Sequence, residues 1–253
     1  MSKPQYYTTP IKTTGMAPGI PFIVGNEAAE RFNFYGMRAV LVVFMTKYLV
    51  DRSGAAAPMD ENDAAAAYHW FQFASYFFPT LGAIVSDAFW GKYYTILRIS
   101  LVYCLGSVVL ALDHTRLGLT LGLTLIAIGT GGIKACVASH VGDQFGPDNQ
   151  HLLSRAFGWF YFSVNAGSTV SFLLIPWLLE HYGPGPAFGL PAVLMLAATY
   201  VFWSGRYKFA HIPPGGKKLL RETFSRDGLS ALGKLAAIFV FMAVFWSLYD
   251  QSG

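Results

Sequence analysis

Long apolar runs separated by short polar segments make up most of this chain. A helix that crosses a bilayer needs about 20 mostly apolar residues, because the hydrocarbon core is roughly 30 Å thick and holds no water for the backbone amides. The pattern predicts seven crossings, at residues 26–50, 64–86, 93–112, 117–140, 156–179, 182–205 and 235–249. The first crossing has the lowest expected hydropathy, because charged residues interrupt it.

The composition agrees with a membrane protein. Charged residues make up 13% of the chain, against roughly 25% in soluble domains. Most soluble folds and disordered chains are therefore excluded. The two cysteines, Cys104 and Cys136, lie inside apolar runs and indicate neither a disulfide framework nor a metal site. We expect an all-α, polytopic membrane protein without a metal or cofactor.

Charges between the apolar runs predict the orientation, since Lys and Arg are enriched in cytoplasmic loops. The loop at 51–63 contains four acids and one arginine, which places it outside. The N-terminus, with Lys3 and Lys12, is expected in the cytoplasm. The stretch at 206–234 is also expected there, with Arg206, Lys208, Lys217, Lys218, Arg221, Arg226 and Lys234. The net charge of +4 thus reflects membrane topology, and a nucleic-acid partner is not expected.

Six crossings with both ends inside, followed by a basic linker and a seventh crossing, predict one complete bundle and the start of another. A seven-helix receptor would place its N-terminus outside, opposite to the charge bias. We expect a cytoplasmic segment at 1–25, a six-helix bundle at 26–207, a basic cytoplasmic linker at 208–232 and the start of a second bundle at 233–253. On this interpretation the chain is truncated.

The first predicted helix carries charges where lipid would disfavour them. Glu27, Arg31, Phe34 or Tyr35, and Arg38 recur at intervals that place them on one face of a helix. An ionisable residue near the bilayer centre costs at least about 2.5–3.5 kcal/mol, so this stripe is expected to line an aqueous pathway, with Glu27 and Arg31 paired. An amphipathic helix at the membrane surface is the alternative. The apolar continuation AVLVVFMTKYLV favours a crossing.

Three further polar residues lie within predicted crossings. Lys134 follows the run GTGG at 129–132, which permits close helix approach or local unwinding. Its expected counterpart is Asp250, although a lysine whose amine reaches the bundle edge remains an alternative. His69 could accept a proton or make one structural hydrogen bond. Asn165 could bind a peptide group or link two helices by a hydrogen bond.

Motifs of soluble enzymes are not found in the sequence. It lacks a paired-histidine zinc motif, a GxSxG nucleophile elbow and a phosphate-binding GxxxxGK[ST] loop. An enzyme is therefore not expected.

Four segments resemble one transporter family. Residues 27–35, EAAERFNFY, resemble the ExxERFxYY motif of the proton-coupled oligopeptide transporters in the major facilitator superfamily. Residues 82–106 and 157–168 are similar to the two signatures of that family, and 245–251 resemble the opening of its seventh helix. Phe34 departs from the motif, because it replaces a tyrosine and removes one hydroxyl.

The resemblance implies roles for individual residues. Glu27, Glu30 and Arg31 would carry proton coupling, together with His69. Lys134 and Asp250 would form a gating salt bridge, and Asp87 and Gly91 would belong to the cytoplasmic turn of the superfamily. The implied substrate site consists of Phe34, Tyr35, Arg38, Tyr76, Lys134, Asn165 and Trp246.

The function that the resemblance implies is proton-coupled symport of di- and tripeptides by alternating access. Its partners would be the peptide, protons, the lipid bilayer and a second bundle of the same protein, in a plasma or inner membrane. The linker is too short for two additional helices, which implies twelve helices in all. A related carrier for nitrate, drugs or another small solute is one alternative, and an intramembrane enzyme is another.

Overall fold

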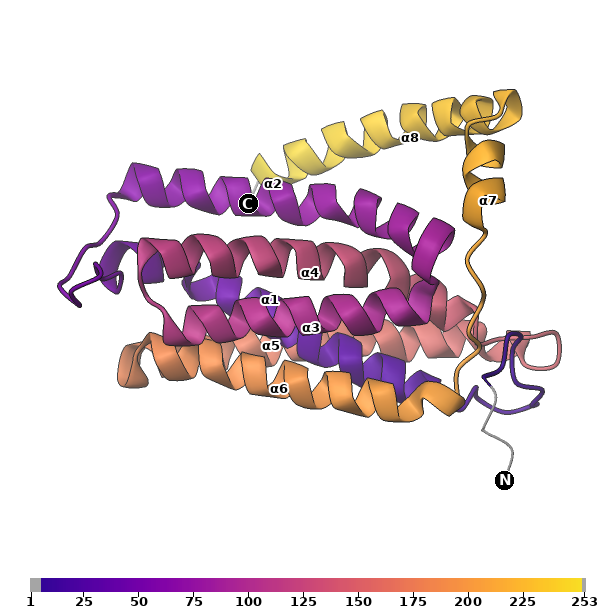
Figure 1. Cartoon of the computed structure of the whole chain (residues 1–253), viewed down its shortest axis with the longest axis horizontal. Coiled ribbons are helices and arrows are strands. Elements are labelled where there is room, and N and C mark those ends of the chain that lie inside the picture. The colour runs from indigo at the N-terminus through magenta and orange to yellow at the C-terminus, as the bar shows by residue number, and fades with distance from the viewer. Residues whose placement is uncertain (1–5, 252–253) are drawn as a thin grey trace.

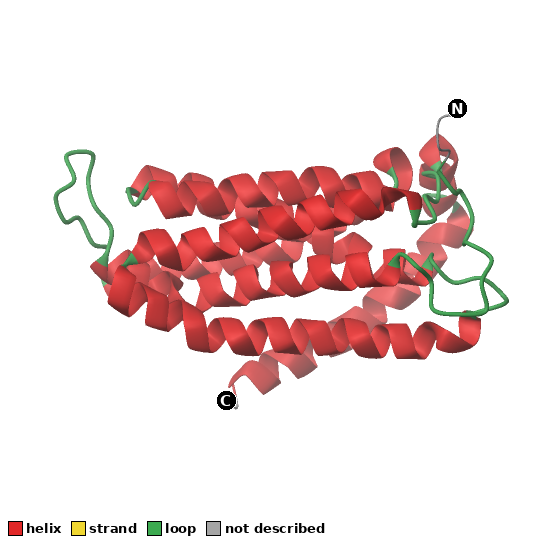
Figure 2. Cartoon of the chain, turned by 90° about the horizontal axis from the view of Figure 1, so that it is seen from below, coloured by secondary structure: helices red, strands yellow, loops and turns green. Residues whose placement is uncertain are grey.

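The computed structural model describes residues 6–251, which form helices joined by loops, with no β-strand among them. Long helices lie side by side along one axis, and the connecting loops gather at the two ends of the bundle (Figures 1 and 2). The helices are α1 Ile20–Lys47, α2 Glu61–Val85, α3 Lys92–Leu112, α4 Arg116–Gly142, α5 Leu153–Tyr182, α6 Pro184–Ser204, α7 Gly216–Thr223 and α8 Arg226–Gln251.

Helix α1 occupies the centre of the bundle. It packs against α5 and α6 and also contacts α2 and α4, while α3 packs between α4 and α6. In Figure 1, α6 lies at one side of this group, and α8 lies at the opposite side, beyond α2. The buried residues of α1 therefore face protein on several sides, and this position allows α1 to hold charged side chains away from lipid.

Among the described residues, four helical segments are long and apolar enough to cross a membrane, at Lys92–Leu112, Arg116–Gly142, Gln150–Tyr182 and Pro184–Tyr207. The predicted crossings at 93–112, 117–140 and 156–179 fall within the first three segments, and the one at 182–205 overlaps the fourth but starts two residues too early, because Tyr182 still belongs to α5. Helix α1 does not reach the same hydropathy, because it carries five ionisable residues. Helix α2 also falls short although its apolar run contains no charge, because His, Gln, Tyr and Trp lower its hydropathy.

Local signals explain several helix ends. The Asp60 carboxylate caps α2 by accepting hydrogen bonds from the amides of Asn62 and Asp63, each at 2.9 Å. Thr115 caps α4 through the amide of Gly118. A π-helical turn, Ser86–Trp90, follows α2, and Gly91 then starts α3 with a φ of +76°, a region that favours glycine.

The predicted linker at 208–232 contains more helix than expected. Helix α7 lies within it, and α8 begins at Arg226 instead of near 235. The reason is a local cap: the Ser225 hydroxyl accepts a hydrogen bond from the amide of Gly228. Helix α1 likewise begins at Ile20, before the predicted residue 26, with Pro21 in its first turn.

The GTGG run at 129–132 permits close packing and leaves α4 unbroken. A Cβ atom at Gly82 of α2 would lie 2.7 Å from the Cα atom of Gly132, and one at Gly131 would meet the Phe78 side chain. Small residues thus bring α2 and α4 together. Close approach is the role that the run has here, and local unwinding is not.

Candidate functional site

Three ionisable side chains of α1 form a buried cluster. The Arg31 Nε atom lies 2.8 Å from Glu27 Oε1 and 2.7 Å from Glu30 Oε2. The three residues are at most 3% exposed. The pairing of Glu27 with Arg31 was predicted from their spacing and is present. The expectation that both residues line an aqueous pathway is wrong in this structure, because neighbouring helices cover them.

Glu30 connects this cluster to α4. The Thr130 hydroxyl donates a hydrogen bond of 2.7 Å to Glu30 Oε1, and Glu30 itself is fully buried. A hydrogen bond to a carboxylate is stronger than one between neutral groups, so this contact fixes the Glu30 side chain. Thr130 was not expected in the site, because a contact between residues one hundred positions apart has no local sequence signal.

Arg38 lies farther along the same face of α1 and is half-buried. Its Nε and Nη2 atoms donate to the Tyr68 hydroxyl of α2, at 3.2 and 3.0 Å. The Phe34 ring lies between the two arginines, with its centroid 5.9 Å from the Arg31 guanidinium carbon and 5.6 Å from that of Arg38. Both guanidinium groups therefore make cation–π contacts with a ring that carries no hydroxyl. Tyr35 packs against Phe172.

Lys134 of α4 faces Tyr76 of α2. The Lys134 Nζ atom lies 4.5 Å from the centroid of the Tyr76 ring, and the Tyr76 side chain is 62% exposed. The expected pairing with Asp250 is not tested, because the side chains of Asp250 and Trp246 lie outside the part of the chain that the structure describes. The backbones of both residues belong to α8.

His69 and Asn165 are exposed. The ring of His69 contacts only the neighbouring Tyr68 ring, at 5.8 Å, and makes no hydrogen bond with a described residue. The structural hydrogen bond considered for His69 is therefore absent among these residues. The Asn165 Nδ2 atom donates to the carbonyl of Tyr161 on the same helix, and Asn165 makes no interhelical hydrogen bond among the described residues.

Asp87 and Gly91 lie in the short connection between α2 and α3. The backbone carbonyl of Asp87 accepts a hydrogen bond of 2.8 Å from the amide of Gly215, just before α7. A Cβ atom at Gly91 would lie 3.2 Å from the Ile212 carbonyl oxygen. This turn is thus in contact with the segment that joins α6 to α7.

The sequence pattern that defines the POT family matches residues 93–226, which are more than half of the chain. The chain belongs to the POT family. The fold is accordingly that of the N-terminal part of a major facilitator transporter, a multi-pass membrane protein.

Relatives in the POT family support this assignment over a wider range. The chain is 35% identical to "Peptide transporter family 1" of Drosophila melanogaster, over 94% of this chain and 38% of the relative. It is also 35% identical to "Solute carrier family 15 member 2" of Danio rerio, over 95% of this chain and 39% of the relative. The chain therefore spans about two fifths of the length of these relatives.

A crystal structure of the POT family transporter PepTSo has the same fold. It superposes with a TM-score of 0.72 and 43% identity, over 79% of this chain and 39% of that chain. The chain thus matches about two fifths of a protein that is named as a transporter.

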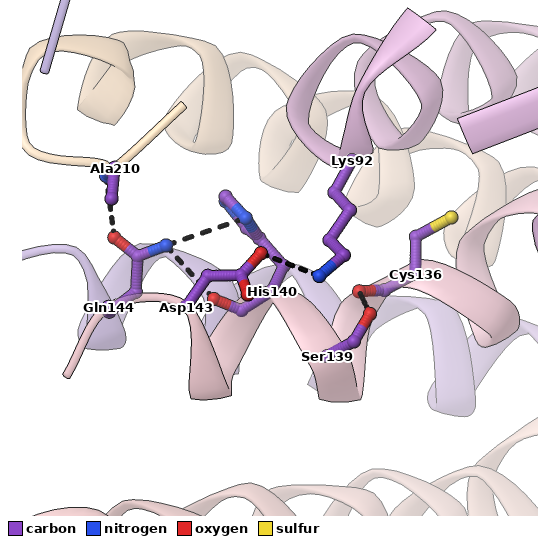
Figure 3. Close-up of polar contacts among 7 residues, drawn as sticks. All are labelled: Lys92, Cys136, Ser139, His140, Asp143, Gln144 and Ala210. Carbon is purple, nitrogen blue, oxygen red and sulfur yellow. Dashed lines mark hydrogen bonds and ion pairs between the residues drawn. The ribbon is translucent and has the colours of Figure 1, made fainter. Parts of the chain in front are cut away.

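A polar network at one end of this POT-family bundle was not predicted (Figure 3). Lys92, at the start of α3, pairs with Asp143 at the end of α4, with Nζ and Oδ2 2.7 Å apart. The buried Gln144 donates from Nε2 to the His140 carbonyl at 2.9 Å and accepts at Oε1 from the amide of Ala210 at 2.8 Å. The network fixes the segment after α6 to α4. Its only sequence signal was opposite charge in two neighbouring loops.

His211 extends this attachment towards the N-terminal segment. Its ring centroid lies 4.4 Å from those of both Tyr6 and Tyr93, and its Nε2 atom is 2.6 Å from the Arg206 carbonyl oxygen. Burial lowers the pKa of His211, and the hydrogen bond to Arg206 only partly opposes this effect. The neutral imidazole is therefore the form that fits this site.

Proposed function

We propose that the protein containing this chain is a proton-coupled symporter of di- and tripeptides. The buried cluster of Glu27, Glu30 and Arg31 is the observation that carries the proposal. When both carboxylates are ionised, the three side chains carry two negative charges and one positive charge, so their net charge is −1. One added proton makes the buried cluster neutral. A change in burial or in the Arg31 pairing would then alter how readily that proton binds.

The peptide site proposed here uses two cations near the cluster, the half-buried Arg38 and the exposed Lys134. A dipeptide is a zwitterion, so both of its charged ends need replacements for water. Arg38 and Lys134 would meet the carboxylate with charge-assisted hydrogen bonds. Tyr35, Tyr76 and Asn165 would contact the backbone groups that all peptides share, and Phe34 would position Arg38. An acid from the second bundle would meet the ammonium group.

The remaining roles follow from family membership. Lys134 and Asp250 would form a gating ion pair, Trp246 would complete the peptide site, and His69 would assist proton transfer. Asp87 and Gly91 would form a turn that moves with the cytoplasmic gate. The names of the two curated relatives, a peptide transporter and a solute carrier, support a transport role.

The proposed topology places the N-terminus and the segment at 206–234 in the cytoplasm of a cell that holds this protein in its plasma or inner membrane. Residues 26–207 would form the first bundle, with 1–25 preceding it, 208–232 as the linker and 233–253 opening the second bundle. Transport would require both bundles, since alternating access depends on two units that rock about a shared site.

Uptake by proteoliposomes that contain the complete protein tests this function. With an inward proton gradient, labelled dialanine should accumulate, and unlabelled dialanine should compete whereas nitrate should not. Mass spectrometry of the liposome contents should find intact dipeptide. Competition by nitrate would instead support a carrier for another solute, and internal alanine would support an intramembrane enzyme.

A further inference from the structure

Two cavities join into one groove on the surface formed by α1, α5 and α6. The first, of about 710 Å³, lies at the N-terminal ends of α1 and α5 and includes Ile20, Val24 and Leu152. The second, of about 590 Å³, continues between α1, α5 and α6. Gly25 lines both cavities, and a Cβ atom there would meet nothing within 4 Å. The two cavities thus meet at the open position of Gly25, and together they are called the groove below.

The charge of this groove lies at one end. Arg155 is the one ionisable residue among the described residues that line the two cavities. Its side chain is exposed and makes no hydrogen bond or ion pair with any other described residue. Trp159, one turn farther along α5, lines the same cavity. An arginine and a tryptophan at one end of an apolar surface are typical of the region where lipid headgroups meet the hydrocarbon.

The groove is longer than one lipid leaflet is thick. From Arg155 to Val170, which lines the second cavity, α5 advances fifteen residues, or about 22 Å at 1.5 Å per residue. Half of the hydrocarbon core is about 15 Å thick, so the groove passes from the headgroup level to beyond the bilayer centre. An acyl chain attached to a headgroup at Arg155 fits within this length.

The groove also lies on the side of the described bundle opposite to α8. Helices α5 and α6 are on the lower side of Figure 1, whereas α8 is at the top. The buried charges of α1 do not line it. This apolar surface is therefore suited to contact with lipid.

We propose that this groove binds an anionic glycerophospholipid. The phosphate pairs with the Arg155 guanidinium, and one acyl chain lies over Gly25 along α1 and α5. Arg155 selects for negative charge, because basic groups at a membrane surface attract anionic lipids, and its planar guanidinium matches a phosphate. The apolar remainder of the groove contributes affinity without selecting a headgroup.

Native mass spectrometry of the complete, detergent-purified protein tests this site. Titration with phosphatidylglycerol and with phosphatidylcholine of the same acyl chains should show about fivefold tighter binding of the anionic lipid, the effect of roughly one basic residue at a membrane surface. Arg155→Gln should remove this preference. The control Arg116→Gln, which changes an exposed arginine at the opposite end of the bundle, should retain it.

A second pair of variants tests where the acyl chain lies. Gly25→Leu fills the groove and should weaken binding of both lipids, whereas Gly158→Leu, also in open space but outside both cavities, should not. Equal binding of the two lipids by the unaltered protein, or a preference that survives Arg155→Gln, would overturn the proposal. Unchanged binding in Gly25→Leu would overturn it as well. Each result is independent of peptide transport, because none of these residues belongs to the proposed peptide site.

Discussion

Arg31 lies between two carboxylates in a part of the bundle that solvent does not reach. Removing one partner of a buried ion pair typically costs about 3–5 kcal/mol, because the remaining charge is left without compensation. The cluster therefore depends on keeping its charges balanced. Proton binding at Glu27 or Glu30 is one way to restore that balance when the Arg31 pairing changes.

Thr130 provides a test at the scale of a single residue. Thr130→Val keeps the shape of the side chain but removes the hydroxyl that donates to Glu30. We expect the free energy of unfolding to fall by about 1–3 kcal/mol, because a buried carboxylate oxygen loses its donor. Unfolding in mixed detergent micelles, followed by circular dichroism, measures this change.

The matched control for Thr130 lies on the same helix. The exposed Thr120 donates its hydroxyl to the Arg116 carbonyl, so Thr120→Val should have little effect, and Thr130→Ser should retain most of the stability. If Thr130→Val and Thr120→Val lower the free energy of unfolding equally, the hydrogen bond to Glu30 contributes no extra stability.

At the scale of helices, the apolar pattern was sufficient to predict α3, α4, α5 and α6, because length and hydropathy are local properties. The pairing of Glu27 with Arg31 was predictable for the same reason, since a helix brings residues four apart together. The contact of Glu30 with Thr130 was not, because it depends on how α1 packs against α4. The early start of α8 was missed because the cap at Ser225 lies within a polar, basic stretch.

The segment that joins α6 to α7 gives a prediction about pH. The pKa of His211 is lowered in the folded protein, so unfolding or release of this segment takes up a proton below the ordinary value of 6.5. The contribution of His211 to docking is thus fully present above about pH 6.5 and is lost as the pH falls towards the folded pKa. The Arg206 carbonyl and the rings of Tyr6 and Tyr93 surround the His211 ring, and this burial disfavours its charged form.

Amide hydrogen exchange between pH 7.5 and 5.5, corrected for intrinsic rates, measures this docking. Protection of the amides of Ala210 and His211, which bond to Gln144 and Tyr7, should fall on acidification, by at most about tenfold per pH unit for one proton. His211→Gln should abolish the pH dependence, and the exposed His151→Gln should leave it intact. Protection that is constant or rises on acidification would contradict the role of His211.

At the scale of the whole molecule, the described bundle presents exposed aromatic side chains on α2 and α5, among them Trp70, Tyr76 and Phe162. Lys134 and Asn165 are exposed as well. The chain spans about two fifths of its POT-family relatives, so such a surface supports the proposal that a second bundle covers it. The buried cluster, Arg38 and Lys134 would then lie close to the boundary between the two bundles.

Peptide transport by Glu27→Gln and Glu30→Gln variants of the complete protein tests the central claim most directly. Each substitution replaces an ionisable group of the buried cluster by a neutral one of similar shape. Proteoliposomes with an inward proton gradient measure accumulation of labelled dialanine, and preloaded proteoliposomes without a gradient measure peptide exchange. We predict that at least Glu27→Gln retains exchange while accumulation falls to the level seen without a gradient. Gradient-driven accumulation that survives in both variants would contradict proton coupling through this cluster.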